Sequence, residues 1–550
     1  MLSSDTASHG IAPVAAPSVD LVPVRRVLVS VFDKTGIDRL AAGLKAAGVR
    51  VASTGGTASA LAAHGLDVDD VSAITGFPEV LDGRVKTLHP HIFAGILARG
   101  DRPDDLDVLA EHGIERFDAV IVNLYAFESV IAKPDCTPPE AIELIDIGGP
   151  SLVRAAAKNH AFAAVVTHPD QYDDFLAAIG RGGTTLAERR LLAARAFEHT
   201  ARYDTVIARW MADHAGAGPR HQHAGAEGLL PARLDLDVDC RLTLRYGENP
   251  HQAAAMYAPI GTNLGLAGLR QRCGKELSYN NLLDLDAAVR LANLVADPAA
   301  VVIKHTNPCG AASDTKVAAA LATAMAADPT SAFGSIVAVN RMFDRAAAEV
   351  LLAPGLFVEV IAAPAFEEAA VELLTTKPTW KSSVRMVEVP PGNPWDATAG
   401  LELRSVAGGL LAQRPDDTPD DPAAWRVVTQ KTPAAEHTAA LHFAFTLVRR
   451  LTSNAICVCQ RMSLVGAGVG QTSRVDSVRI ALEKAGERAH GAVLASDAFF
   501  PFPDSIELIQ QAGIAAIVQP GGSKRDPEVI AAADAAGIPM VFTARRHFRH

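Results

Sequence analysis

The stretch VVIKHTNPCGAA, residues 301–312, decides how the second half of this chain is interpreted. Its apolar start is typical of a buried strand, and Asn307-Pro308-Cys309-Gly310 predicts a loop. Lys304 and His305 lie between them, so the pattern places a cation and an imidazole at the C-terminal end of a strand, where open α/β sheets bind ligands. His can move protons near neutral pH, and Lys can stabilise a developing negative charge. The alternative is a surface lysine beside a hydrogen-bonded turn histidine.

Length and composition narrow the classes of protein to which this chain can belong. A chain of 550 residues with 49% hydrophobic residues predicts several domains with large cores. A net charge of −11 argues against a nucleic-acid partner, and six cysteines without a CxxC pair argue against disulfides and a structural zinc site. We expect no membrane span, because no apolar run is long enough. Residues 1–20 lack a signal-peptide pattern and predict a disordered tail, and hence a cytoplasmic protein.

Strand-like runs alternate with helical patterns in the first half, which predicts a parallel sheet with right-handed crossovers. These runs are 26–32, 49–53, 117–124 and 162–167. Residues 53–57, STGGT, lie between a strand and a helix, where hydroxyls and free N–H groups suit a phosphate. The alternative is a tight turn without a ligand.

Two further segments of the first half carry cations. Residues 76–97 contain too many Gly, Pro and His residues for an ordinary helix, and the crowding of RVKTLH at 84–89 predicts a clamp for an anionic substrate. In residues 145–160, a GGPS turn starts a helix that carries Arg154 and Lys158 on one face, for which the alternative is a solvated helix surface.

The motifs DKTGI, STGGTA, LDGRVKTLHP, NLY and IDIGG…RAAAKNH, in this order, resemble the N-terminal domain of the bifunctional AICAR transformylase/IMP cyclohydrolase family. The resemblance implies a methylglyoxal-synthase-like domain that closes the ring of inosine monophosphate (IMP). By motif it implies the site residues Lys34, Thr54, Gly55, Arg84, Lys86, Thr87, Asn123, Tyr125, Asp146 and Lys158. Among them Lys86, Tyr125, Asp146 and Lys158 are expected nearest the chemistry.

The middle of the chain predicts a long helix, 188–212, followed by a linker at 216–233. We interpret His221 and His223 in that linker as loose histidines rather than a metal tract. Beyond it, residues 244–252 predict a loop, 274–288 runs into a helix, and 328–341 gives a Ser/Gly turn and a strand. Residues 436–451 predict a helix, and 540–543 a strand before the basic, aromatic end.

The motifs LRYGENPHQ, KHTNPCG, LTSNAI, GxGQ.SRVD, SDAFFPFPD and R.FRH resemble the transformylase domain of the same family. The resemblance implies an α/β domain of two cytidine-deaminase-like lobes that transfers formyl from 10-formyltetrahydrofolate to AICAR, giving FAICAR. His305, oriented by Asn454, is expected to act as the base, with Lys304 stabilising charge. The implied binding residues are Arg245, Tyr246, Ser331, Phe333, Gly334, Asn340, Arg474, Phe499, Asp504 and Arg546. Without the motif, Phe499 would be interpreted as a core residue.

The resemblance sets the domains at 21–215 for cyclisation and 234–550 for formyl transfer, and implies a homodimer with transformylase sites across its interface. It implies no zinc and allows a monovalent cation. The sequence departs from the family beside the cyclohydrolase site at Phe32, Phe93 and Ala126, which bears on the tuning of that site.

Other functions fit the sequence less well. Residues 466–470 read GxGxG rather than the GxGxxG of nicotinamide enzymes, and residues 268–275 are one residue too long for a P-loop. A zinc deaminase would need HxE and PCxxC motifs, which the chain lacks. A regulatory scaffold would not need two anion-binding constellations. A zinc-independent relative of a nucleotide deaminase, or a transformylase with an inactive cyclohydrolase domain, remains the alternative function.

Overall fold

The computed structural model describes residues 20–81, 84–214, 230, 234, 236–391, 401–416 and 418–550. The chain divides into two compact units, Met1–Leu234 and Asp235–His550. The predicted tail, apart from Asp20, and the predicted linker, apart from Leu230, lie outside the described residues. In the described ranges, no helix combines the length and apolarity needed to cross a bilayer.

The first unit is built on a five-stranded parallel sheet in the order β3-β2-β1-β4-β5. The strands are β1 (Arg26–Val31), β2 (Arg50–Ser53), β3 (Val68–Asp70), β4 (Ala119–Asn123) and β5 (Ala164–Val166). Both faces of this sheet are buried, which explains the nearly continuous apolar runs of its strands. The predicted parallel sheet is therefore confirmed.

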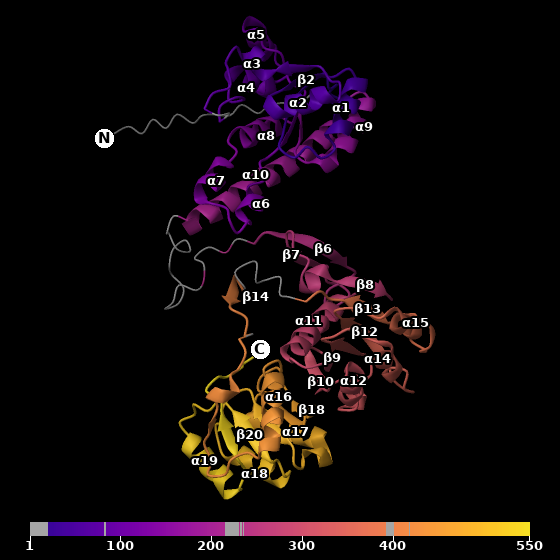
Figure 1. Cartoon of the computed structure of the whole chain (residues 1–550), viewed down its shortest axis with the longest axis vertical. Coiled ribbons are helices and arrows are strands. Elements are labelled where there is room, and N and C mark those ends of the chain that lie inside the picture. Colours follow the sequence, from indigo (N-terminus) through magenta and orange to yellow (C-terminus); the bar gives the residue numbers. More distant parts are fainter. Residues whose placement is uncertain are drawn as a thin grey trace, which may run out of the picture. The chain divides into compact units, whose positions relative to one another are not determined.

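Helices cover the two faces of this sheet (Figure 1). The helices are α1 (Ile37–Ala46), α2 (Gly55–Ala63), α3 (Val71–Thr75), α4 (Pro90–Leu97), α5 (Pro103–Glu111), α6 (Phe127–Ile131), α7 (Pro138–Glu143), α8 (Gly148–Lys158), α9 (Tyr172–Gly180) and α10 (Leu186–His214). Residues of α1, α2 and α9 share one core with the sheet, and residues of α4, α8 and α10 share the other. The long helix predicted at 188–212 is confirmed as α10, which packs along α8.

One expectation for this unit is wrong. Residues 76–97 were expected not to form a helix, yet their second part is α4, because Pro90 occupies the first turn, where proline fits a helix. His89 caps this helix by accepting the backbone N–H of His91.

The second unit contains a 12-stranded mixed sheet in the order β16-β21-β20-β19-β17-β18-β10-β9-β11-β12-β13-β8. Its strands are β8 (Arg270–Cys273), β9 (Ala299–Lys304), β10 (Asn307–Ser313), β11 (Ser335–Val339), β12 (Val358–Ala363), β13 (Arg385–Glu388), β16 (Arg426–Val427), β17 (Ile456–Gln460), β18 (Ser463–Gly468), β19 (Val493–Ser496), β20 (Ala516–Gln519) and β21 (Met540–Phe542). Two separate hairpins, β6 (Val238–Leu244) with β7 (Ala254–Pro259) and β14 (Glu402–Val406) with β15 (Gly409–Gln413), complete the strands.

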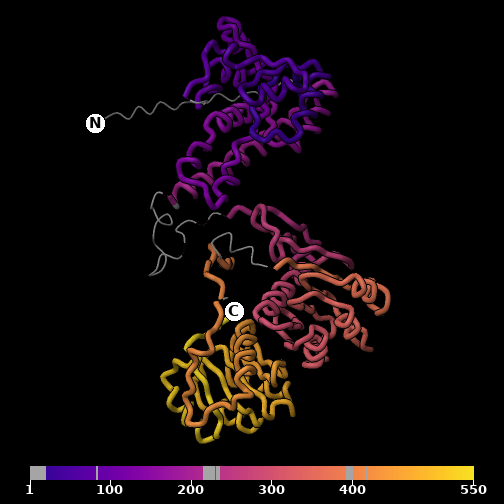
Figure 2. The backbone as a smooth tube through the Cα atoms, viewed as in Figure 1, coloured from indigo at the N-terminus to yellow at the C-terminus, as the bar shows by residue number. Residues whose placement is uncertain are grey.

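This sheet consists of two halves with the same topology. The order β10-β9-β11-β12-β13 repeats as β18-β17-β19-β20-β21, and in each half the first three strands pair antiparallel and the last three parallel. Figure 2 shows that the chain completes the first half before it builds the second, which is drawn from orange to yellow. The halves join where β10 pairs with β18.

Helices line both faces of each half. They are α11 (Tyr279–Leu294), α12 (Val317–Met325), α13 (Pro329–Ala332), α14 (Arg345–Val350), α15 (Glu368–Thr376), α16 (Thr438–Val448), α17 (Arg474–Ala485), α18 (Asp504–Gln511) and α19 (Asp526–Ala535). Helices α11 and α16 share one continuous core with both halves. The opposite faces are covered separately, by α12, α14 and α15 on one half and by α17, α18 and α19 on the other.

The opening stretch differs from its prediction. Residues 307–310 were expected to be a loop, but they begin strand β10, which returns antiparallel beside β9 with a register shift between Pro308 and Gly310. Strand β9 is antiparallel to both of its neighbours, so Lys304 and His305 lie at a hairpin turn rather than at the carboxyl edge of a parallel sheet.

Candidate functional site

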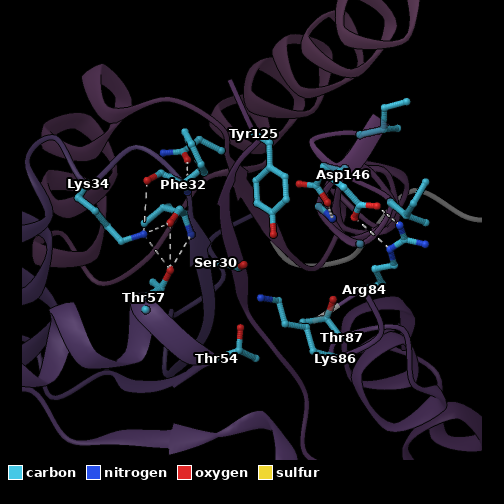
Figure 3. Close-up of a pocket in the computed structure, with 18 of the residues that line it drawn as sticks. Ser30, Phe32, Lys34, Thr54, Thr57, Arg84, Lys86, Thr87, Tyr125 and Asp146 are labelled. Carbon is cyan, nitrogen blue, oxygen red and sulfur yellow. Dashed lines mark hydrogen bonds and ion pairs between the residues drawn. The ribbon is translucent and has the colours of Figure 1, made fainter. Parts of the chain in front are cut away.

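A cavity of about 530 Å³ opens at the carboxyl ends of β1, β2 and β4 in the first unit. This is the edge where parallel sheets bind ligands. It is lined by Ser30, Val31, Phe32, Lys34, Thr54, Gly56, Thr57, Arg84, Lys86, Thr87, Asn123, Tyr125, Ile142, Glu143, Ile145, Asp146, Ile147, Gly148 and Gly149. Figure 3 shows the phenol of Tyr125 pointing into this space.

Two helix N-termini reach the cavity. Thr54 is the N-cap of α2, and within the described residues its side chain makes no capping hydrogen bond, so its hydroxyl is available to a ligand. Gly148 and Gly149 form the first turn of α8. A Cβ at Gly149 would lie 2.2 Å from Asp146, so this turn has no room for a side chain. Backbone N–H groups at helix N-termini attract anions, and Lys34 and Lys86 add positive charge.

The loop between β1 and α1 forms one wall of the cavity. The Asn123 side chain accepts the backbone N–H groups of Phe32, at 2.5 Å, and Asp33, at 2.9 Å, and donates to the Asp33 carbonyl. The Lys34 ammonium donates to the Val31 carbonyl and lies 3.3 Å from the Thr57 hydroxyl. Burial, with the nearby charge of Lys86, lowers the pKa of Lys34.

Asp146 is the carboxylate at the opposite wall. Burial raises its pKa, although the N–H groups of Gly149 and Gly148 and the charge of Lys86 act in the other direction. Its backbone N–H donates to the Tyr203 hydroxyl at 2.8 Å, and that hydroxyl donates to the Leu144 carbonyl. A carboxyl group held at a raised pKa beside a lysine is suited to proton transfer.

The structure brings most of the predicted residues of this unit together. All of those implied by the family motifs line the cavity except Gly55 and Lys158. Gly55 follows Thr54 directly. Lys158 is exposed at the C-terminal end of α8, about 15 Å along the helix from Gly148 at 1.5 Å per residue. The structure therefore does not bring Lys158 to the cavity, and its face also carries Arg154, as on a solvated helix surface.

The sequence did not indicate several lining residues. Ser30 stands alone in the apolar β1 run, a weak signal of a polar edge. Glu143 forms an ion pair with Arg84, so this arginine is neutralised within the protein. The residues implied by motif also do not include Val31, Phe32, Ile142, Ile145, Ile147, Gly148 and Gly149. Gly56 and Thr57 belong to the STGGT segment that was predicted to suit a phosphate.

The three family departures have different surroundings. The Phe32 ring lies 5.3 Å from the Tyr125 ring, so it forms part of the cavity wall. Phe93 packs against the core between the sheet and α8 and α10. Ala126 is the N-cap of α6.

In the second unit, Lys304 and His305 lie at the turn between β9 and β10. The Lys304 ammonium donates to the carbonyls of Phe333, at 2.9 Å, and Gly334, at 3.2 Å. His305 is exposed, as a proton carrier must be to meet a substrate. The Thr306 N–H donates to Asp284 on α11 at 2.6 Å. The predicted Phe333 and Gly334 are thus brought to Lys304.

Ser331 belongs to the same neighbourhood through α13. Its hydroxyl donates to Asp328 at 2.8 Å, and Asp328 pairs with Lys484 at 2.6 Å. Phe333 is 58% exposed and packs beside Phe357, so its outer face is free for a planar ligand.

Asn454 and Arg474 form a second group. The Asn454 amide donates to the Gln471 carbonyl at 2.9 Å, and its oxygen accepts from Arg474 at 2.8 Å. Among the described residues, no side-chain hydrogen bond of Asn454 reaches His305. The expected orientation of His305 by Asn454 is thus not formed in this structure. Arg474 is buried and ion-paired with Asp497, so its guanidinium already has partners within the protein, and its predicted substrate-binding role stays a prediction.

Asn340 lies in the interior of the second unit. Its side chain is buried, accepts the backbone N–H of Ala299 and donates to the carbonyls of Val295 and Asp297, so it ties α11 to β9. Asn340 thus has a structural role in this fold, and its predicted binding role stays a prediction.

The other predicted residues of this unit are at its surface. The Arg245 guanidinium lies 5.4 Å from the Tyr246 ring, and that of Arg546 lies 4.7 Å from the Phe548 ring. Phe499 is 36% exposed, whereas the adjacent Phe500 is fully buried, so Phe500 is the core residue of this pair. Asp504 begins α18. Among the described residues, no group of three or more His, Cys, Asp or Glu side chains is placed to hold a metal ion.

These two units define a two-domain α/β enzyme, with a ligand cavity at a parallel-sheet edge in one unit and an exposed histidine beside a lysine in the other. Family models agree with both. The AICARFT/IMPCHase bienzyme model matches residues 156–484, and the MGS-like domain model matches residues 36–151. The chain belongs to the AICARFT/IMPCHase bienzyme family.

Curated relatives match over nearly the whole length. The bifunctional purine biosynthesis protein PurH of Rhodopirellula baltica is 52% identical over 96% of this chain and 100% of its own. The proteins of the same name from Sorangium cellulosum and Mycobacterium marinum are 50% and 47% identical, each over 96% of this chain. A solved structure, "Crystal structure of ForH", is 38% identical and covers 34% of this chain and 97% of its own, with a TM-score of 0.31.

Proposed function

We propose that this chain catalyses the last two steps of IMP biosynthesis: formyl transfer from 10-formyltetrahydrofolate to AICAR, then closure of FAICAR to IMP with loss of water. The observation that carries the proposal is the cavity of the first unit, where Asp146 with a raised pKa faces Lys86 between two helix N-termini. The near full-length similarity to bifunctional purine biosynthesis proteins supports both steps.

The cavity suits an intramolecular ring closure. FAICAR carries a phosphate that the N-terminus of α2, with Thr54, can bind. Its carboxamide nitrogen attacks its own formyl carbon, so holding one conformer supplies much of the rate. Asp146 accepts one carboxamide proton, and Lys86 stabilises the oxyanion at the formyl oxygen. That oxygen then leaves as water with this proton and the proton of the formamido nitrogen, which forms the ring C=N bond. Tyr125, which follows β4, holds the heterocyclic base of the substrate in place.

The turn of the second unit suits formyl transfer. The 5-amino group of AICAR is conjugated and weakly nucleophilic, so it needs a base for its proton. We assign this role to His305, whose exposed imidazole can reach a bound ligand. Lys304 stabilises the tetrahedral oxyanion or protonates the departing folate nitrogen. Arg245 and Arg546 are exposed cations suited to phosphate, and Phe499 to stacking.

The remaining assignments complete this proposal. Residues 21–215 carry the cyclisation and 234–550 the formyl transfer. We propose that the protein is a cytoplasmic homodimer in which the partner subunit completes the transformylase site. This is consistent with the exposed positions of Arg245 and Arg546, which lie in separate groups on one chain. 10-Formyltetrahydrofolate is the cosubstrate, and neither step uses zinc.

The test uses purified protein, AICAR and 10-formyltetrahydrofolate without added metal, and follows tetrahydrofolate and IMP together. Wild type is expected to make both products. His305→Ala is expected to make neither, yet still to close supplied FAICAR. Wild type that forms tetrahydrofolate but leaves FAICAR unclosed would refute the assignment of the first unit, and absence of both products would refute the proposed function.

A further inference from the structure

The turn that carries His305 adopts an unfavourable backbone. His305 and Thr306 connect β9 to β10 with φ of 52° and 61°, a two-residue hairpin turn in the left-handed region. Such turns favour Asn and Gly, and a β-branched residue like Thr is rare there. A catalytic histidine on such a turn keeps its direction only if surrounding groups hold the turn in place.

Side chains from two distant elements hold the two backbone polar groups of Thr306. Its N–H donates to the Asp284 carboxylate on α11 at 2.6 Å. Its carbonyl accepts a hydrogen bond from the Arg549 guanidinium at 3.0 Å. Asp284 and Arg549 are separated by most of the unit in sequence, so only the tertiary fold brings them to this turn.

Arg549 also contacts the segment that carries Asn454. The same Nη1 atom lies 2.6 Å from the Arg450 carbonyl, at the end of α16. The Ser453 N–H donates to the Arg549 carbonyl at 2.8 Å, and the Arg549 N–H lies 3.3 Å from the Ser453 hydroxyl. One residue of the C-terminal tail therefore joins the β9–β10 turn of the first half to the segment before β17 in the second half.

We propose that Arg549 is a positioning residue for formyl transfer. It fixes the His305 turn at a set distance from the Asn454 segment, so that the imidazole meets the amine of bound AICAR. This inference rests on the proposed function of His305 and adds a residue that touches no substrate. Small displacements of a reacting group cost large factors in rate, up to about 100-fold for about 1 Å.

The test compares Arg549→Ala, Arg549→Lys and a matched control, Arg545→Ala. Arg545 lies in the same tail but donates to the carbonyls of Thr418 and Pro419, away from the turn. Arg549→Ala is expected to lower kcat for formyl transfer about 10- to 100-fold. KM for AICAR is expected to change less than about threefold, because the arginine does not bind it. Closure of supplied FAICAR and the thermal unfolding midpoint should stay near those of the control.

Rescue separates positioning from general stability. Free guanidinium ion at millimolar concentration should restore part of kcat to Arg549→Ala, because it can donate again to the Thr306 carbonyl. For the same reason, Arg549→Lys should keep part of the kcat that Arg549→Ala loses. Guanidinium ion should leave kcat of the Arg545→Ala enzyme unchanged.

The outcomes distinguish this inference from the proposed function. Active Arg549→Ala beside inactive His305→Ala overturns the inference alone. Active His305→Ala refutes the assigned role of the turn and the inference with it. A loss of kcat that neither guanidinium nor lysine relieves, accompanied by a lower unfolding midpoint than the control, assigns Arg549 to stability only and also overturns the inference.

Discussion

The buried ion pair between Arg474 and Asp497 gives a sharp prediction about the second unit. Asp497 is fully buried, and Arg474 on α17 is 6% exposed. The Arg474 guanidinium donates to the Asp497 carboxylate, to the Ser496 hydroxyl at 2.8 Å and to the Asn454 side chain at 2.8 Å. Replacing Arg474 with Met keeps an unbranched aliphatic side chain but removes the charge, and within the described residues it leaves the Ser453 hydroxyl as the side-chain partner of the Asp497 carboxylate.

The expected loss of stability follows from burial. Removing one partner of a buried ion pair costs about 3–5 kcal/mol, because the other charge stays buried without compensation. The same helix offers a control, since Arg479 pairs with Asp476 at 2.5 Å on the surface, where such pairs contribute about 0–1 kcal/mol. Arg474→Met should thus lower the free energy of unfolding by several kcal/mol, and Arg479→Met by less than about 1 kcal/mol.

The assay is urea unfolding of the whole chain, followed by circular dichroism. The double variant Arg474→Met/Asp497→Leu should recover much of the loss, because it removes the unpaired charge. Equal effects of Arg474→Met and Arg479→Met would refute the reasoning. So would a double variant whose loss is the sum of the two single losses, since that would mean that the residues are not coupled.

Three further predictions concern activity and stability. Asp146→Asn should abolish closure of FAICAR, and because burial raises the pKa of Asp146, the acid limb of the wild-type closure rate should lie above the usual aspartate range. Burial lowers the pKa of His547, but hydrogen bonds to Asp416 and Asp420 outweigh it and the net pKa is raised. The stability from this pairing is therefore full below the pKa of an unfolded histidine and is lost as the pH rises through the raised value, so His547→Gln should flatten that part of the curve of unfolding free energy against pH. Gly468→Ala should destabilise the second unit by about 1–3 kcal/mol or more in urea unfolding, because its Cβ would lie 2.0 Å from a backbone carbonyl of α17.

The physical reason for the GxGxG spacing at residues 466–470 is visible only in the folded structure. Gly466 and Gly468 lie in β18, and a Cβ at either would lie about 2 Å from a carbonyl of α17. They allow a helix to pack closely on a strand. The GxGxG spacing therefore reflects packing, and the decision against a nicotinamide enzyme did not need this geometry.

The structure adds information on strand pairing and on the surroundings of single residues that the sequence could not supply. An apolar strand pattern is the same whether its neighbours run parallel or antiparallel, so the β9–β10 hairpin could not be inferred from residues 301–312. Lys158 shares a motif with the residues of the cavity, but a helix of 11 residues carries it away from the cavity. Asn340 and Arg474 are polar residues in binding motifs, and only their surroundings show that backbone groups and Asp497 already occupy them.

The sequence alone determined the α/β class, the parallel sheet of the first unit and the family, because strand and helix periodicity and motif order are local properties of the chain. By motif it also indicated eight of the residues that line the cavity. The tertiary structure decided which polar groups are free and which are already bonded, how the two halves of the large sheet join, and that Arg549 and Asp284 meet at the His305 turn. These depend on contacts between residues hundreds of positions apart, which follow from packing of whole elements and not from any local pattern.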